Sequence, residues 1–481
     1  MVKNKNNRDN VLLVLGIVLF RIVLEVALFY FVFPRYPYRY DKNIKASNVI
    51  LSLVFFIASL VVIEMIYRRR MKFTSSLIIV LLIYLISYIP GNLLIAYCGY
   101  GLEYILLFNI FWILMLGGSW LVSIIQHKPY ILPEKEFAYY NKHNYATRNT
   151  VLILDQKQAS PFKWAYFGFI LLLSAYALFL AYKFNGLRLT ISFDDIYDMR
   201  EEASGYFGTF DSLFINIFST TVLPVSMGFA LRKKKVLMVM WLFFMTIVMF
   251  SIGGNKSYLL VVVASVLVYP IISNNIIKKL PLIMAVGFAL LLALHKITNE
   301  AKLLDYAVDI LIRRTMFTPS EIGYSYYLFF QENPAIWLAD EAFISRLGWT
   351  GPYNGTPLAT VVGMAMYGTT GINNGLFGNA LGEFGSWGIV IFPVIFAFFA
   401  WLIDGCTFNV ETKTIFPFIV SYVVILPNTS IAGILYTFIL PLFGLSLLYK
   451  ISGMAYFKEK TEIKFEKLIN KSKIAKHRQA Q

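Results

Sequence analysis

Two groups of basic residues have the spacing to bind an anion. Arg313 and Arg314 are adjacent at the end of an amphipathic stretch, and neighbouring guanidiniums can hold a diphosphate through paired hydrogen bonds. Lys256 follows Gly253-Gly254-Asn255 in a short turn between two apolar runs, where the cation and the Asn255 amide would face a phosphate. The alternative interpretations are contact with lipid headgroups for the arginines, and a plain glycine turn whose lysine reaches the membrane boundary.

Acidic residues gather in one segment, Asp194-Asp195-Ile196-Tyr197-Asp198. The segment matches the DDxxD pattern of magnesium-diphosphate sites, and carboxylate clusters suit hard cations. Such sites use two acidic motifs, however, whereas this motif stands alone and is followed directly by Arg200, Glu201 and Glu202. A solvated charged loop is the favoured interpretation. The four histidines also lack the spacing of a zinc site, so neither a metal nor another cofactor is predicted.

Amide and aromatic side chains that suit sugar hydroxyls occur in two glycine-rich loops. Asn354 lies in Gly351-Pro352-Tyr353-Asn354-Gly355-Thr356-Pro357, and Asn374 lies in Gly371-Ile372-Asn373-Asn374-Gly375. Turn formation alone explains each loop at least as well. The sequence contains no Gly-x-Ser-x-Gly elbow of a serine hydrolase and no phosphate-binding loop of a nucleotide enzyme.

The composition is that of a membrane protein. The chain of 481 residues is 58% hydrophobic and only 15% charged, whereas soluble domains keep about a quarter of their residues charged. These proportions exclude a soluble enzyme and a disordered tail, and they predict an all-α polytopic membrane protein. In a soluble protein, the net charge of +16 would favour nucleic acid. Because Lys and Arg also accumulate in cytoplasmic loops, the predicted partner is the lipid bilayer and not nucleic acid.

Apolar runs of about 20 residues can cross a bilayer, and in this chain they predict twelve transmembrane helices. Lys and Arg concentrate in the segments on one side of these spans, beginning with the N-terminus. Since positive residues mark the cytoplasmic side, both termini are expected inside. The expected spans are 11–33, 48–67, 74–97, 104–125, 165–184, 212–231, 236–252, 258–274, 280–295, 387–403, 415–431 and 432–449.

The chain is expected to form one membrane domain, 1–481, with three longer segments between or after the spans. These are a charged outer loop, 185–211, a large outer loop, 296–386, and a basic cytoplasmic tail, 450–481. A tail rich in Lys and Arg is attracted to anionic lipid. We therefore expect it to rest on the inner surface of the membrane.

The large outer loop has helical signals of its own. Lys302, Asp305, Asp309 and Arg313 share one face of an amphipathic stretch over 300–317. Thr318-Pro319-Ser320-Glu321 then reads as a capping box that opens a helix through Phe330. We expect both helices to lie on the outer leaflet.

Arg21 and Glu25 lie four residues apart inside the first expected span. Charge within a membrane is costly and usually marks function. A pair at this spacing can also neutralise itself and bridge to neighbouring helices. Both interpretations stay open.

Several features together resemble the O-antigen and capsular repeat-unit polymerases of the Wzy type. These are twelve spans with both ends inside, a large outer loop late in the chain, and a smaller charged outer loop around Asp198-Met199-Arg200-Glu201. The turn 253–257 is similar to the glycine-rich basic turn of these enzymes, and the run 374–388 to the segment that leads them back into the membrane. The resemblance covers nearly the whole chain and implies an architecture like that of the GT-C glycosyltransferases.

The resemblance implies a metal-independent glycosyltransferase without a cofactor, at the outer face of the bacterial cytoplasmic membrane. Its donor would be a growing glycan on a polyprenyl-diphosphate carrier, and its acceptor a lipid-linked oligosaccharide repeat unit. The product would be an O-antigen, a capsule or an exopolysaccharide. The chain-length regulator and the flippase of the same pathway are the implied protein partners.

Such an enzyme needs particular groups in its site. The leaving diphosphate requires fixed positive charge, and the candidates, expected to meet at one membrane face, are Arg200, Lys256, Arg313 and Arg314. The acceptor hydroxyl requires a base, for which the candidate is Glu321 or an acid of the 194–202 cluster. The expected substrate-binding residues are Tyr324, Asn255, Asn354 and Asn374, with Arg314 on the diphosphate.

Three other functions remain open. A flippase or transporter for lipid-linked oligosaccharides would line a polar path across the bilayer, whereas polar residues here concentrate in the outer loops. An O-antigen ligase would carry a histidine in its large outer loop, where this chain has only His295, at the start. The third is a structural subunit of a glycan-export complex.

Overall fold

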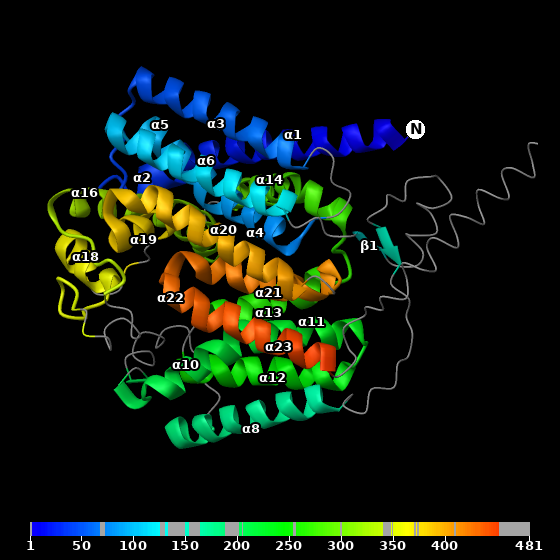
Figure 1. Ribbon diagram of the computed structural model, residues 1–481. Helices are drawn as coiled ribbons and strands as arrows, with labels where there is room; N and C mark the ends of the chain where they lie inside the picture. Colours follow the sequence, from blue (N-terminus) through cyan, green and yellow to red (C-terminus); the bar gives the residue numbers. More distant parts are fainter. Residues whose placement is uncertain are drawn as a thin grey trace, which may run out of the picture.

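The computed structural model describes the chain over residues 2–67, 73–125, 130–132, 150–152, 164–187, 202–203, 205–253, 256–298, 301–339, 348, 350–369, 372, 375–407 and 410–451. Within these ranges the protein is almost entirely helical (Figure 1). Two three-residue strands, β1 (Tyr130–Leu132) and β2 (Thr150–Leu152), pair in parallel. The architecture is therefore set by how the helices pack.

Nine helical stretches in the described ranges are long and apolar enough to cross a membrane. The chain is thus a helical, multi-pass membrane protein, as its composition predicts. Several stretches join two or three elements end to end. They are formed by α1 (Val2–Ala27), η1 (Leu28–Val32) and α2 (Phe33–Arg35); α3 (Ala46–Tyr67); α4 (Ser75–Ile83), η2 (Tyr84–Tyr88) and α5 (Ile89–Tyr97); α6 (Leu102–Ile125); α8 (Ala165–Asn185); α10 (Thr209–Ile217), η3 (Phe218–Val222) and α11 (Leu223–Arg232); α14 (Asn274–Ile297); α19 (Gly375–Phe384), η5 (Gly385–Trp387) and α20 (Gly388–Thr407); and α22 (Ile431–Ile434), η7 (Leu435–Ile439) and α23 (Leu440–Ile451).

Three of the twelve expected spans correspond to shorter apolar helices. These are α12 (Val236–Gly253), α13 (Lys256–Val268) and α21 (Thr412–Ile425), the last followed by the 3-10 turn η6 (Leu426–Asn428). The number of crossings therefore stays a prediction. The expected large outer loop contains α15 (Lys302–Val308), η4 (Asp309–Phe317), α16 (Thr318–Glu332) and α18 (Leu358–Tyr367).

Prolines explain where π-helical segments interrupt the α-helices. The described ranges contain five π-helical segments, and each ends two residues before a proline: Pro34, Pro90, Pro224, Pro319 and Pro441. Proline has no N–H, and its ring clashes with the carbonyl four residues earlier. The backbone N–H of the residue before the proline donates to the carbonyl five residues earlier instead, as Thr318 N–H does to the Arg313 carbonyl. Proline alone is not sufficient, because Pro281, Pro393 and Pro417 lie within α-helices.

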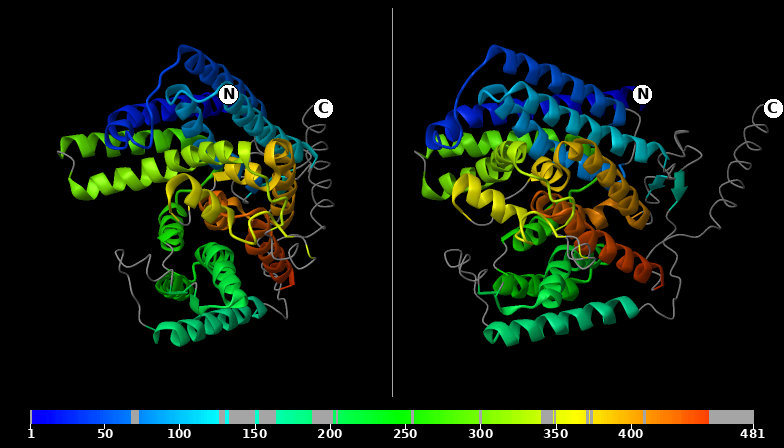
Figure 2. Two further views of the ribbon diagram at one scale, coloured as in Figure 1. Left: turned by 90° about the vertical axis from the view of Figure 1, so that its left-hand side faces the viewer. Right: turned by 60° about the vertical axis from the view of Figure 1, so that its left-hand side comes forward.

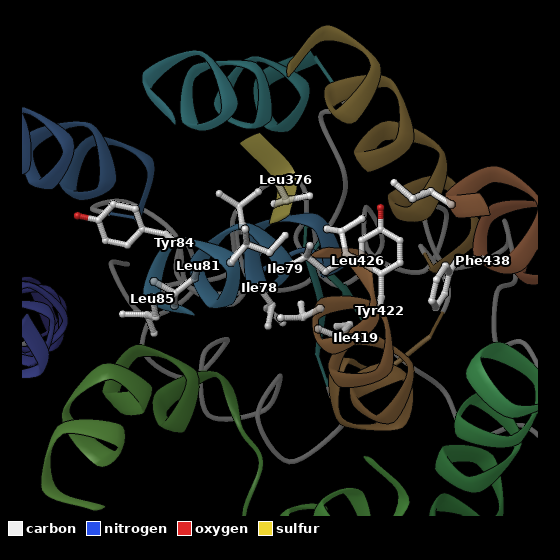
Figure 3. Packing of buried hydrophobic residues seen from close by; sticks show 14 of the residues in the cluster. Ile78, Ile79, Leu81, Tyr84, Leu85, Leu376, Ile419, Tyr422, Leu426 and Phe438 are labelled. Carbon is white, nitrogen blue, oxygen red and sulfur yellow. The ribbon is translucent and has the colours of Figure 1, made fainter. Parts of the chain in front are cut away.

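The helices form two groups joined by a central layer (Figures 1 and 2). Helices α1 to α6 pack with α14, and α8 to α13 pack together. Helix α21 contacts α4 of the first group and α11 and α13 of the second, while α20 contacts α4 and α6 and packs on α23, which contacts α8. Figure 3 shows the core between the groups, where side chains of α4, α19, α21 and η7 face one another. Leu81, Leu376, Tyr422 and Phe438 are among these fully or almost fully buried residues.

The helices of the large loop pack more deeply into the protein than the sequence suggested, and their place at the outer leaflet stays a prediction. All ten residues of α19 are buried, and α16 packs against α19, α5 and η2. Their contact is close at Gly375, where a Cβ atom would lie 2.8 Å from the Pro319 carbonyl oxygen and φ is +67°. Asp309 and Arg313 are buried too. The Asp309 and Arg313 side chains of the amphipathic stretch are thus directed into the protein, where they pair with each other, whereas Lys302 at its start is exposed.

The capping-box prediction was also wrong. Helix α16 continues directly from η4, and no side chain caps its start. The Thr318 hydroxyl lies 3.3 Å from the Tyr40 hydroxyl instead. Glu321 accepts hydrogen bonds from Arg39 and Tyr367. The Thr-x-x-Glu pattern therefore reflects tertiary contacts, and not a helix start.

Arg21 and Glu25 bridge neighbouring helices. The Arg21 guanidinium donates to Asn92 and, at 3.0 Å, to the Ser52 hydroxyl, and it lies 4.4 Å from the centroid of the Phe56 ring. Glu25 accepts a hydrogen bond from Tyr97. These contacts tie α1 to α3 and α5 and favour the structural interpretation of the pair.

Candidate functional site

Asp309 holds two arginines and a tyrosine at one point. Its carboxylate accepts from Nε and, at 2.9 Å, from Nη2 of Arg313, and from Nε of Arg314 at 3.1 Å. The Tyr36 hydroxyl donates to the same carboxylate at 2.8 Å, and the Arg313 guanidinium carbon lies 4.2 Å from the centroid of the Tyr36 ring. The π-helical turn makes this possible because it holds more residues than an α-helical turn. The residues four and five positions after Asp309, Arg313 and Arg314, therefore both lie beside its carboxylate.

The two arginines differ in exposure. The Arg313 side chain is 8% exposed and the Arg314 side chain 54% exposed. Arg313 is thus committed to Asp309 and Tyr36, whereas Arg314 can offer its remaining N–H groups to a ligand. An arginine fork of this kind suits a phosphate or carboxylate group.

Glu321 is the centre of a second cluster, about three helical turns beyond Asp309. Nε of Arg39 donates to Oε2 of Glu321 at 2.8 Å, and the Tyr367 hydroxyl donates to Oε1. The Ser325 hydroxyl lies 2.6 Å from the Tyr367 hydroxyl. Tyr40 lies between the two clusters, because its hydroxyl meets Thr318 at the junction of η4 and α16.

The two central carboxylates have opposite pKa shifts. Burial raises the pKa of Asp309, but hydrogen bonds from Arg313 and Tyr36 outweigh this effect, and the pKa lies below its usual value. Burial also raises the pKa of Glu321, and here the opposing effects of Arg39 and Tyr367 are too small to reverse it. Asp309 therefore favours its ionised form and orients the arginines, and Glu321 is the better proton acceptor.

A third cluster lies beside the first. His295 is fully buried, with Nε2 3.1 Å from Oδ1 of Asp305 and Nδ1 3.3 Å from the Tyr30 hydroxyl. Arg35 also donates to Asp305, and its guanidinium carbon lies 4.5 Å from the centroid of the Phe31 ring. These contacts join the ends of α2 and α14 to α15. Because His295 is enclosed, it is suited to holding these elements together and not to touching a substrate.

The structure brings together only some of the predicted site residues. Arg313, Arg314 and Glu321 lie in the two clusters. Lys256 begins α13, which packs against α11, α12 and α21, whereas η4 and α16 pack against η2 and α5. The convergence of Lys256 with Arg313 therefore stays a prediction. Three further predicted residues lie outside the described ranges, as does the 194–198 acidic segment: Arg200, Asn255 and Asn374.

Of the two remaining sugar-binding candidates, Tyr324 lies one turn from Glu321 on α16, and Asn354 lies in the loop before α18. The Tyr324 ring stacks on the Tyr100 ring, with centroids 3.9 Å apart and planes at 18°, so that one of its faces is covered. Asn354 is exposed in a turn at a φ of +52°. Sugar binding by either residue stays a prediction.

Sequence reasoning missed the contribution of the first loop. Pro34-Arg35-Tyr36-Pro37-Tyr38-Arg39-Tyr40 supplies four of the contacts above, from Arg35, Tyr36, Arg39 and Tyr40. The dense alternation of arginine and tyrosine was a signal that could have singled it out. Tyr367, at the end of α18, had no such signal. Among the described residues, no group of three or more His, Cys, Asp or Glu side chains could hold a metal ion.

Comparisons of the chain with protein-family models, with curated proteins and with solved structures find no match. Its chemistry must therefore be argued from its own residues. The site joins an exposed guanidinium, a buried guanidinium fixed by a carboxylate, and a second carboxylate of raised pKa. Together these groups can bind an anion and accept a proton nearby.

Proposed function

We propose that the protein is a repeat-unit polymerase, a glycosyltransferase that moves a growing glycan from a polyprenyl-diphosphate carrier onto a lipid-linked oligosaccharide repeat unit. The observation that carries the proposal is the pairing of Arg313 and Arg314 with a nearby buried Glu321 in a multi-pass membrane protein. The family resemblance supplies the substrate class. The arginines and the glutamate supply two groups that this reaction needs.

In this proposal, Arg314 contacts the leaving diphosphate, and the buried Arg313 adds fixed positive charge beside it. Negative charge develops on the diphosphate oxygen as its bond to the sugar breaks, and fixed N–H donors in a partly dry site stabilise that charge. Asp309 and Tyr36 hold Arg313 in place, so little reorganisation accompanies the reaction. Glu321 serves as the ultimate proton acceptor for the acceptor hydroxyl. No step uses a metal.

The proposal includes an orientation and a location. The end of the bundle that carries α2, α16 and α18 is the outer face, and both termini are inside. The protein crosses the bacterial cytoplasmic membrane twelve times with an architecture like that of the GT-C glycosyltransferases. Its protein partners are a chain-length regulator and a flippase, and its product is an O-antigen, a capsule or an exopolysaccharide.

The direct test is polymerisation by the purified protein in vesicles that contain lipid-linked repeat units. We expect a ladder of longer glycans without nucleotide sugar, and the same ladder in the presence of EDTA. Loss of the ladder with EDTA would contradict metal independence and return attention to the 194–198 acidic segment. Movement of the repeat unit across the bilayer without any lengthening would favour the flippase.

A further inference from the structure

Glu321 is the best proton acceptor of the site, yet it is shielded. Its side chain is 8% exposed. One carboxylate oxygen accepts from Nε of Arg39 at 2.8 Å, and the other accepts from the Tyr367 hydroxyl. A sugar hydroxyl could reach the carboxylate directly only by displacing one of these partners. The group that stands between Glu321 and the surroundings is therefore the hydroxyl of Tyr367, which is itself only partly buried.

The Tyr367 side chain is held by residues of two other elements, α16 and the loop after α2. It donates to Glu321 of α16, and the Ser325 hydroxyl, one turn further along the same helix, lies 2.6 Å away. The guanidinium carbon of Arg39, from the loop after α2, lies 5.3 Å from the centroid of the Tyr367 ring. Since Tyr367 donates to Glu321, it accepts from Ser325, and one lone pair on its oxygen is left for a further donor.

Helix α18 is anchored so that this position is maintained. It packs on α16 through a small apolar cluster outside the main core, formed by Ile322, Tyr326, Ile336, Leu358 and Val362. The helix ends immediately after Tyr367, at Gly368, whose φ of +66° suits the left-handed cap. Tyr367 thus lies at the end of a fixed element, with its hydroxyl directed to Glu321.

We propose that Tyr367 is a catalytic residue that relays the proton of the acceptor hydroxyl to Glu321. This inference rests on the proposed polymerase function. The acceptor oxygen bonds to the anomeric carbon of the donor while the bond from that carbon to the diphosphate oxygen breaks, and the diphosphate leaves with the electron pair. The acceptor proton passes to the Tyr367 oxygen, and the Tyr367 proton passes to Glu321.

The charges around the pair suit such a relay. Burial raises the pKa of Tyr367, and the nearby Glu321 carboxylate raises it further, so the hydroxyl stays protonated until the acceptor donates to it. Burial likewise raises the pKa of Glu321, which favours proton uptake. Arg39 faces both residues and Arg313 acts on Glu321 from η4. These cations favour the ionised carboxylate and oppose the effect of burial.

The test compares Tyr367→Phe, Glu321→Gln and the double variant in the polymerisation assay. Each single change should lower kcat by on the order of 10²-fold, the low end for a lost general base, and leave KM for the donor lipid unchanged. The double variant should be no slower than the slower single variant, because residues that act as a unit are not additive. Ser325→Ala leaves the ring and the carboxylate in place and should give a smaller loss of kcat.

Tyr166→Phe is the matched control. The Tyr166 hydroxyl donates to the Ser226 hydroxyl at 2.7 Å, in a contact between α8 and α11. The variant therefore loses a tyrosine–serine hydrogen bond of similar length outside the candidate site, and kcat should stay at the wild-type value. Equal losses in Tyr166→Phe and Tyr367→Phe would show a structural role and overturn the relay.

The outcomes separate the relay from the polymerase proposal. If the wild-type protein forms no polymer, the polymerase proposal is contradicted, and so is the relay that rests on it. If the wild type is active and the Tyr367→Phe variant is equally active, only the relay is contradicted. An inactive Glu321→Gln variant beside that active Tyr367→Phe variant would mean that Glu321 meets the acceptor directly.

Discussion

Arg39 and Glu321 are 282 positions apart in the sequence, and Nε of Arg39 donates to Oε2 of Glu321 at 2.8 Å. The contact makes the short loop after α2 a part of the site on η4 and α16. Tyr36 and Tyr40 of the same loop meet Asp309 and Thr318. The candidate site is thus assembled from the first and the largest loops of the α16 end of the bundle.

Arg314 offers the clearest test of anion binding. Its side chain is 54% exposed and makes one bond to Asp309, so removing it should disturb the fold little. If it contacts the diphosphate, Arg314→Ala should lower turnover on the order of 10²-fold, because one preorganised donor to the developing charge is lost. Turnover is measured at matched protein levels in vesicles. Lys302→Ala, an exposed cation at the start of α15, is the control and should keep its activity; equal effects would indicate headgroup contact only.

Activity should fall in acid at a pH above the usual range for a glutamate. A base works only when ionised, and burial raises the pKa of Glu321 above its ordinary value of about 4.3. The value of kcat/KM should therefore decline as the pH falls through this raised pKa. Arg39 favours the ionised form, so Arg39→Gln should move the decline to higher pH. Lys42→Gln, in the same loop, should leave it in place; a downward shift in Arg39→Gln would contradict the assignment of Glu321.

Close helix packing at Gly228 predicts a steric effect on stability. A Cβ atom there would lie 1.8 Å from the Thr414 carbonyl oxygen of α21, so Gly228→Ala forces the two helices apart. Overpacking of this kind costs about 1–3 kcal/mol or more. We expect less folded protein in the membrane and a lower Tm in detergent. Gly168→Ala, on α8 with open space around the added methyl group, should match wild type or gain stability; equal behaviour of both variants would contradict the α11–α21 packing.

Orientation can be tested by labelling of single cysteines. With Cys98 and Cys406 replaced by serine, a cysteine placed at position 140 should be labelled only from inside, and one at position 340 only from outside. The reason is the concentration of Lys and Arg in the expected inner segments. Labelling of both from the same side would overturn the twelve-span arrangement.

The sequence predicts the membrane class and most of the spans, because apolar runs such as those in α3 and α6 are long enough to read without tertiary information. The widened turns also have a local signal, the proline two residues after each π segment. The burial of α19 had none, because its glycines and Asn379 gave it the appearance of a loop. Close contact of α16 and α19 at Gly375 allows it.

The site was predictable only in part. Arg313 and Arg314 attract notice as an adjacent pair, and Glu321 was reached through a capping pattern that the structure does not support. Their partners Arg39 and Tyr36 come from a loop nearly 280 residues away, and no local pattern predicts such contacts. Tyr367 was missed for the same reason. The roles of Arg200 and Lys256 stay predictions.

The most direct test of the polymerase proposal measures both products of the reaction, the new glycosidic linkage and the released polyprenyl diphosphate. Vesicles with the wild-type protein and labelled lipid-linked repeat units are sampled over time for new glycosidic linkages and for free polyprenyl diphosphate. We expect one carrier diphosphate to be released for each linkage formed, and both rates to fall together in Arg314→Ala. Linkages formed without release of the diphosphate, or vesicles in which neither product appears, would contradict it.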